Sequence, residues 1–162
     1  MHLNNIGNVY IECDTNIDHI PISTTDEIHL ICTVICNSNY EPVEKFVFNL
    51  NDFDSEKDMI KAWIKMILNN KLELLVGWYL EFDYEYIKER SKVLDIDITS
   101  EIQLPTLSII KYIEQFGYYN NFNGAVRQIL KKTLPCPDKN NIEEYALTCC
   151  KYEFLILKTL NN

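Results

Sequence analysis

Three carboxylates in the sequence lie where predicted strands end. Glu12 and Asp14 stand two residues apart at the end of an apolar run over residues 6–13, so on a strand both side chains point to one face. Asp83 follows a second apolar run, residues 74–76, and opens a charged segment that favours a helix. If the two strands are parallel neighbours, we expect the three carboxylates to converge at one edge of the sheet.

Such a cluster has a specific chemistry. Carboxylates that share a site without a compensating cation repel one another, and a divalent cation between them removes that repulsion. Two hard cations about 4 Å apart can hold both oxygens of an in-line phosphoryl displacement. The structural alternatives are that Asp83 is a helix N-cap and that Glu12 and Asp14 are ordinary polar residues at a strand end.

Apolar periodicity predicts the elements that position these side chains. Strands over residues 6–13, 27–36 and 43–50 form a three-stranded antiparallel meander. A capping box at residues 55–58 opens a helix that runs to residue 70, and a strand over residues 74–76 follows it. Further helices are expected over residues 83–94, 105–117, 121–132 and 142–160. The order predicts an α/β fold, a mixed β-sheet flanked by helices.

Length and composition narrow the class of protein. The 162 residues predict one domain, residues 1–162, with a sizeable core. A net charge of −9 argues against a protein that coats duplex DNA, because such binding depends on neutralising phosphates. Frequent Ile, Asn, Lys and Tyr suggest an AT-rich genome, for example a viral or protozoan one.

The cysteines and the N-terminus indicate the compartment. Six cysteines form no Cys-x-x-Cys pair, and we read them as reduced thiols in apolar stretches, with Cys136 on an exposed loop. The N-terminus has no basic segment followed by an apolar one, so no signal peptide is expected, and no run approaches the length of a membrane span. The sequence therefore predicts an intracellular protein with no membrane partner.

Three segments together resemble a known family. ECDT at residues 12–15, GWYLEFDYEYIKER at residues 77–90 and EYALTCCKYEFLILKTL at residues 144–160 are similar, in order and spacing, to the three motifs of the DEDD 3′–5′ exonucleases. The nearest likeness is to the proofreading exonuclease domain of family B DNA polymerases, with its tyrosine-type third motif. The resemblance implies an RNase H-like fold, Mg²⁺ or Mn²⁺ as cofactor, a two-metal mechanism and the end of a single-stranded nucleic acid as substrate.

The first motif admits two registers. The family reads Asp-x-Glu-Thr, and the register that aligns Thr15 gives Glu12-Cys13-Asp14-Thr15, with the two acids exchanged. The other register puts Tyr10 at the family's Asp and Glu12 at its Glu, and so loses one carboxylate. We prefer the first, because residues 9–11 then supply the buried strand. The resemblance thus assigns metal binding to Glu12, Asp14 and Asp83.

The second and third motifs also depart from the family. Phe82-Asp83 is kept, but Trp78-Tyr79 stand in the region where the family has an asparagine. In the third motif, Tyr-x-x-x-Asp, the tyrosine that orients the attacking water is Tyr145, while Cys149 replaces the final metal-binding Asp.

The cysteine has a chemical consequence. Mg²⁺ prefers hard oxygen ligands, so a thiol weakens the site, and Glu153 one helical turn later is a candidate substitute. Cys149 as a nucleophile has no histidine partner evident in the sequence.

Two functions of different class follow. The first is a 3′–5′ exonuclease domain that acts on or binds single-stranded nucleic-acid ends, with weakened activity, through Glu12, Asp14, Asp83 and Tyr145. The alternative is an inactive, exonuclease-derived scaffold that binds a protein partner, for instance in a viral replication or host-interaction assembly. A structural α/β domain whose resemblance is coincidental is the third reading.

Overall fold

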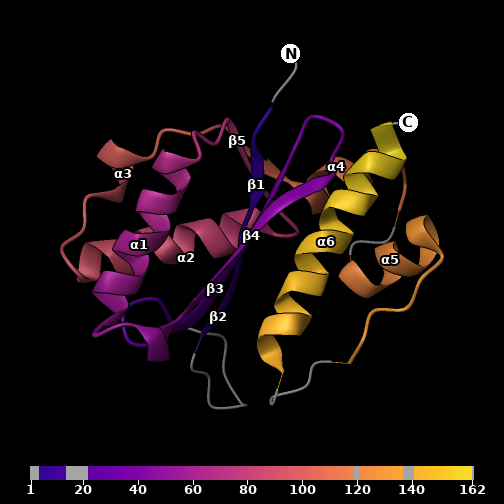
Figure 1. Ribbon diagram of the computed structural model, residues 1–162. Coiled ribbons are helices and arrows are strands. Elements are labelled where there is room, and N and C mark those ends of the chain that lie inside the picture. Colours follow the sequence, from indigo (N-terminus) through magenta and orange to yellow (C-terminus); the bar gives the residue numbers. More distant parts are fainter. Residues whose placement is uncertain (1–3, 14–21, 119–120, 137–140, 162) are drawn as a thin grey trace.

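The structure, a computed structural model, describes residues 4–13, 22–118, 121–136 and 141–161. A mixed β-sheet of six strands forms its middle layer, and helices cover both faces (Figure 1). The strands are β1 (Ile6–Asn8), β2 (Tyr10–Cys13), β3 (Ile28–Cys36), β4 (Pro42–Asn49), β5 (Leu74–Gly77) and β6 (Thr106–Ser108). The α/β architecture expected from the sequence is confirmed.

The antiparallel half of the sheet is the expected meander. β1 and β2 are two parts of one interrupted strand, because both pair antiparallel with β3, and β4 pairs with the other side of β3. Val9 interrupts the strand, and its N–H donates to the carbonyl of Val76 at 3.1 Å.

The parallel half brings the expected strand ends together. β1 runs parallel to β5 in a register that pairs Ile6 with Leu74 and Asn8 with Val76. β6 then pairs parallel with β5. The condition that the first strand and the strand before Asp83 be parallel neighbours is therefore met.

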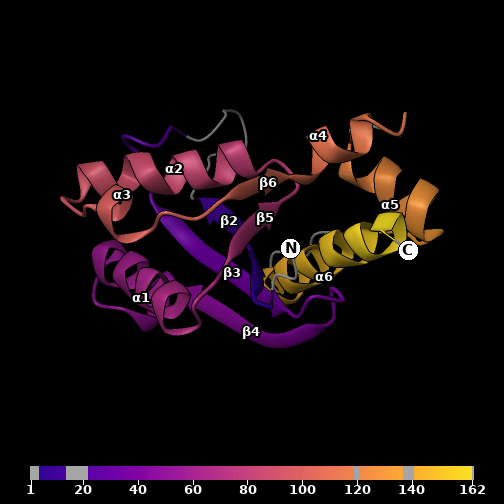
Figure 2. The ribbon, with the colours of Figure 1, turned by 90° about the horizontal axis from the view of Figure 1, so that it is seen from above.

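Each face of the sheet carries its own helices and its own apolar core (Figure 2). One core packs α1 (Glu56–Asn69), α2 (Leu80–Val93) and α3 (Ile98–Glu101) against the sheet, with Trp63 at its centre. The other core packs α4 (Ile109–Glu114), α5 (Phe122–Leu130) and α6 (Ile142–Asn161) on the opposite face. A 3₁₀ turn, η1 (Leu50–Asp52), links β4 to α1. Among the described helices, none has the length and apolar content that crossing a membrane requires.

Local chemistry explains where α1 begins and how it is anchored. The side chain of Ser55 caps α1 by accepting from the N–H of Asp58, as the capping box predicts. Within the core, the indole N–H of Trp63 donates to the hydroxyl of Thr33 at 3.0 Å. Both groups are buried, so this bond satisfies two polar atoms and fixes α1 over β3.

A buried ion pair joins α1 to α2. The guanidinium of Arg90 contacts the carboxylate of Glu56, and the same carboxylate accepts from the N–H of Ile28 at 2.8 Å. Arg90 also donates to the carbonyl of Ser23 at 3.2 Å. Glu56 therefore ties the start of β3 and both helices together.

Two of the expected helices begin at residues other than those predicted. The helix expected over residues 105–117 begins only at Ile109, because residues 106–108 form β6, where β5 supplies backbone partners that a helix would forgo. The helix expected from residue 83 begins three residues earlier, at Leu80, with Tyr79 as N-cap. Asp83 therefore lies in the first turn of α2 and is not its N-cap.

Replacing Arg90 by Met should lower the free energy of unfolding of the domain. Glu56 would remain as a buried charge without its cation, and such losses cost about 3 kcal/mol or more. Urea unfolding followed by circular dichroism measures the change. Lys92→Met, which removes the exposed pair with Glu89 on the same helix, is the matched control and should leave the midpoint nearly unchanged. Equal effects of the two substitutions would contradict this role of Arg90.

Candidate functional site

The candidate site is formed at one end of β2, beside the α6 face of the sheet. Tyr10 and Glu12 alternate with Ile11 along β2 and so project to the same face. The Tyr10 hydroxyl donates to Glu12 Oε2 at 3.0 Å. Of the carboxylates expected here, Glu12 is thus present and already hydrogen-bonded.

Helix α6 adds two further residues to this cluster. The ring of Tyr145 meets the ring of Tyr10 edge-on, with centroids 6.5 Å apart. The Tyr145 hydroxyl and the Cys149 thiol, four residues apart on one face of the helix, are close enough for each to affect the pKa of the other. Glu12, Tyr10, Tyr145 and Cys149 therefore form one continuous group across the junction of β2 and α6.

The phenols and the thiol of this cluster are electrically neutral at pH 7. Burial raises the pKa of the Cys149 thiol to about 12, and its side chain is 3% exposed. Burial, and then the nearby Glu12 carboxylate, raise the pKa of Tyr10 well above its ordinary value. Cys149 is therefore a protonated thiol, unsuited both to nucleophilic attack and to Mg²⁺ binding.

Glu153, the candidate substitute for the missing metal-binding Asp, is hydrogen-bonded within the protein. Its carboxylate is 3% exposed and accepts from the side-chain amide of Asn8 and from the N–H of Trp78, each at 3.0 Å. Asn8 in turn accepts from the N–H of Val34 at 2.8 Å. Both oxygens of Glu153 therefore have protein donors, one next to β5 and one on β1. Burial raises the pKa of this carboxyl to about 8.

Asp83 lies in the first turn of α2 and is half-buried. Burial raises the pKa of its carboxyl to about 7. Among the described residues, the electrostatic neighbours of its carboxylate are Glu153 and Cys13, and the carboxylate has no hydrogen-bonding or ion-pairing partner there. Asp83 is thus a half-buried carboxylate within electrostatic range of Glu153, with no side-chain bond among the described residues that ties it to the fold.

The structure brings some of the expected site residues together. Glu12, Tyr145 and Cys149 are joined through Tyr10, a residue that only the alternative register of the first motif brings into play. Asp14 lies outside the described residues. Within the part of the chain that the structure describes, no group of three or more His, Cys, Asp or Glu side chains is arranged to hold a metal ion.

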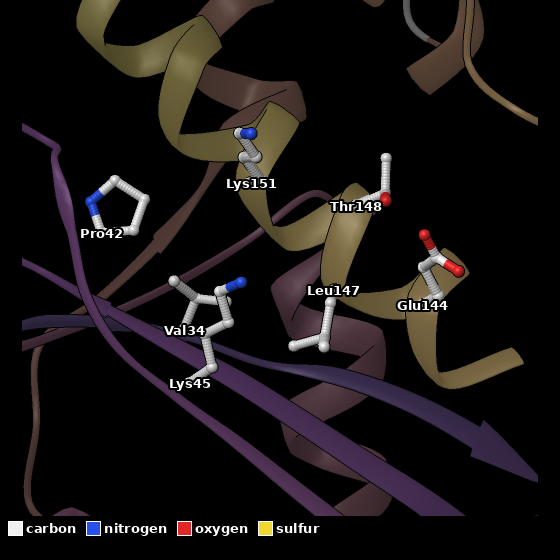
Figure 3. Close-up of a pocket in the computed structure, with 7 residues that line it drawn as sticks. All are labelled: Val34, Pro42, Lys45, Glu144, Leu147, Thr148 and Lys151. Carbon is white, nitrogen blue, oxygen red and sulfur yellow. The ribbon is translucent and has the colours of Figure 1, made fainter.

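Two hollows flank the N-terminal half of α6. The one that contains Tyr145 has a volume of about 220 Å³ and is lined by Pro135, Cys136, Asn141, Glu144, Tyr145 and Thr148. The other lies between β4 and α6 and has a volume of about 510 Å³ (Figure 3). Val34 and Leu147 supply its apolar floor, and Lys45 and Lys151 stand on opposite walls. Glu144 and Thr148 line both hollows, so the two are contiguous along the helix.

The sequence and the fold match a known class of domain. A family model described as "DNA polymerase family B, exonuclease domain" matches residues 10–133, and the chain belongs to this family. The matched residues include the first two motifs, whereas Tyr145 and Cys149 lie beyond them.

A structural comparison extends the match to α6. The fold is similar to that of the family B DNA polymerase from the hyperthermophilic archaeon Pyrobaculum calidifontis, with a TM-score of 0.74 and 14% sequence identity. The match covers 97% of this chain and 24% of that polymerase. The RNase H-like fold implied by the motifs is thereby confirmed. No curated protein matches the chain.

Replacing Glu153 by Gln should flatten the pH dependence of stability. Because folding raises the pKa of this carboxyl from 4.5 to about 8, the folded state binds more protons in that range, and stability falls as pH rises from about 5 to 8. At about 1.4 kcal/mol per pH unit as an upper limit, the loss from Glu153 should be on the order of 2 kcal/mol. Urea unfolding at several pH values measures it.

The control for this test is Glu81→Gln. Glu81 is an exposed acid whose pKa is lowered by Lys111, so its removal should leave the slope between pH 5 and pH 8 as in the unmodified chain. A slope that Glu153→Gln leaves unchanged would contradict the assignment.

Proposed function

We propose that this domain binds the 3′ end of single-stranded nucleic acid and that its metal-dependent hydrolysis is lost or strongly weakened. The observation that carries the proposal is the cluster of Tyr10, Tyr145 and Cys149, which occupies the junction of β2 and α6. Membership of the exonuclease family supports the nucleic-acid end as the ligand. The neutral side chains of Tyr10 and Cys149 at this junction argue against cleavage of the nucleic acid.

The geometry of β2 supports the second register of the first motif. In that register Tyr10 takes the place of the family's Asp and Glu12 that of its Glu, and both project toward α6. Cys149 takes the place of the Asp in the third motif. The two acids that would face each other across the junction are then a phenol and a thiol, both neutral at pH 7.

The described residues do not fit a pair of divalent cations. Glu12 and Asp83 are the carboxylates that the family pattern retains there, and burial raises the pKa of Asp83 to about 7, which weakens it as an anionic ligand at neutral pH. Glu153 is engaged with Asn8 and Trp78. Mg²⁺ needs several oxygen ligands in near-octahedral geometry, and Mn²⁺ prefers similar ligands. Asp14 as a metal ligand stays a prediction.

The double substitution Tyr10→Asp with Cys149→Asp should restore or raise metal-dependent cleavage. The unmodified domain should release no mononucleotides from a labelled single-stranded oligonucleotide beyond the level of Asp83→Ala, with either Mg²⁺ or Mn²⁺. The double variant places two new carboxylates at the junction and should exceed that level by at least tenfold, since it restores hard ligands.

A matched control adds two acids elsewhere. Asn39→Asp with Ser38→Asp places them on the exposed turn before β4, where they should not change the release rate. Release by the unmodified domain that Asp83→Ala abolishes would overturn the proposed loss of cleavage. Failure of a folded Tyr10→Asp, Cys149→Asp variant to gain activity would count against the second register.

The hollow between β4 and α6 favours a second candidate function, a protein-interaction module. Its two lysines, Lys45 and Lys151, form no ion pair among the described residues, and they flank an apolar floor (Figure 3). An extended acidic peptide would match this combination of charge and shape on an otherwise acidic protein. A folded domain that binds no single-stranded oligonucleotide at low salt would favour this candidate over the first.

A further inference from the structure

We propose that the outer edge of β4 binds an extended, acidic segment of a partner protein as an added strand. This inference rests on the second candidate function, the protein-interaction module, and it names how the partner is held. Main-chain hydrogen bonds to β4 would align the segment, and an acidic side chain would lie at Lys45. The surface is separate from the cluster of Tyr10, Tyr145 and Cys149.

β4 has a free edge. Among the described strands it pairs with β3 alone, and the rest of the sheet lies beyond β3 (Figure 2). Its first four residues, 42–45, are exposed. An unpaired edge presents main-chain N–H and C=O groups with which an extended chain can pair. The edge of β4 is therefore a surface on which a further strand can form.

The register of the sheet fixes which groups of β4 point outward. Lys45 lies opposite Val34, and Val47 lies opposite Cys32. The N–H of Val34 donates to the side chain of Asn8 at 2.8 Å, and Asn8 belongs to β1, on the other side of β3 from β4. Because the main-chain groups of successive strand residues alternate in direction, Val34 and Cys32 both face away from β4. In such non-hydrogen-bonded pairs the partner also points outward, so the N–H and C=O groups of Lys45 and Val47 face the free edge.

The side chains of the same two residues project to the α6 face of the sheet. Lys45 lines the larger hollow, with Val34 in its floor and Lys151 on the opposite wall (Figure 3). Val47, two residues on, packs against the apolar core of this face. A strand added along β4 would place residues directly opposite Lys45 and Val47, with their side chains on the same face. Main-chain pairing and side-chain contact would thus occur at the same positions.

The charges at this edge favour an acidic partner. Lys45 and Lys151 form no ion pair with any residue that the structure describes. Glu144 lines the hollow at the end away from Lys45, and its carboxylate accepts from the side chain of Asn141 (Figure 3). An acidic residue opposite Lys45 would therefore be attracted by two lysines, on a protein whose net charge is −9.

The same charges disfavour a second copy of this chain as the occupant. Two β4 strands paired symmetrically about Lys45 would bring two lysines face to face, and like charges directly opposite each other on a sheet are destabilising. Edge lysines are one means by which proteins avoid such self-pairing. An acidic segment from another protein meets no such repulsion.

The regular edge is short, which limits the partner to a few residues. A register shift beside Val43 interrupts the ladder at the start of β4, so the regular edge covers residues 44–49. Along it, an antiparallel segment would place an apolar side chain opposite Val47 and, two residues later, an acidic one opposite Lys45. The recognised pattern is therefore apolar-x-acid in an extended segment.

Binding of the fluorescein-labelled peptide TVTETE, which contains this pattern, tests the proposal by fluorescence anisotropy at low salt. Lys45→Glu should weaken binding about tenfold, and the peptide TVTKTK should bind Lys45→Glu better than it binds the unmodified domain. Lys61→Glu makes the same change of charge on the exposed face of α1 and should leave both affinities unchanged. An affinity for TVTETE that Lys45→Glu leaves unchanged would overturn the proposal.

Methylation of the peptide main chain separates strand pairing from attraction between charges. A methyl group on the amide nitrogen of the first glutamate removes the donor to the C=O of Lys45 and should weaken binding several-fold. The same group on the next threonine, whose N–H points away from β4, should have little effect. If both methylated peptides bind as the parent peptide does, strand addition is wrong and the protein-interaction module stands.

Two further outcomes concern the partner. If the folded domain fails to bind TVTETE even at millimolar concentration, the edge contact and the protein-interaction module both fail, whereas the proposed binding of a nucleic-acid end is unaffected. Size-exclusion chromatography should show a monomer. A dimer that the peptide dissociates would place a second copy of the chain on this edge and overturn the choice of partner.

Discussion

The site depends on one buried carboxyl group, that of Glu153. By accepting from Asn8 on β1 and from the N–H of Trp78 after β5, it fastens α6 to the two parallel strands at the end where they stop. This contact sets Cys149 and Tyr145, one and two turns earlier on the helix, against Tyr10. An acid is stable in such a place because both of its oxygens have donors and because its raised pKa lets it hold a proton.

The consequence is an exonuclease fold with altered chemistry at its centre. The strands and helices have the family's arrangement, yet a hydroxyl and a thiol that stay protonated at neutral pH, those of Tyr10 and Cys149, lie near the carboxylate of Glu12. Under the proposed function, hydrogen bonds and ring contacts stand where the family pattern has metal-binding acids. We propose that binding of a strand end persists in this domain where cleavage does not.

Much of this arrangement could be predicted from the sequence, because it depends on local patterns. Alternating apolar residues fix the meander, and the order of strand and helix fixes the parallel pairing of β1 with β5. The strand β6 could not be predicted, since three residues next to Pro105 become extended only by pairing with β5. The role of Tyr10 was equally hidden: its spacing from Glu12 is visible, but Tyr145 and Cys149 reach it only through the docking of α6.

The central claim, binding of a strand end without its cleavage, is tested most directly by one titration. The domain is added to a single-stranded oligonucleotide labelled at its 5′ end, in EDTA and in Mg²⁺, and fluorescence anisotropy is followed by sizing of the recovered strand. The account predicts the same affinity in both buffers and a strand of unchanged length. Binding that requires Mg²⁺ and yields strands shortened from the 3′ end would contradict it.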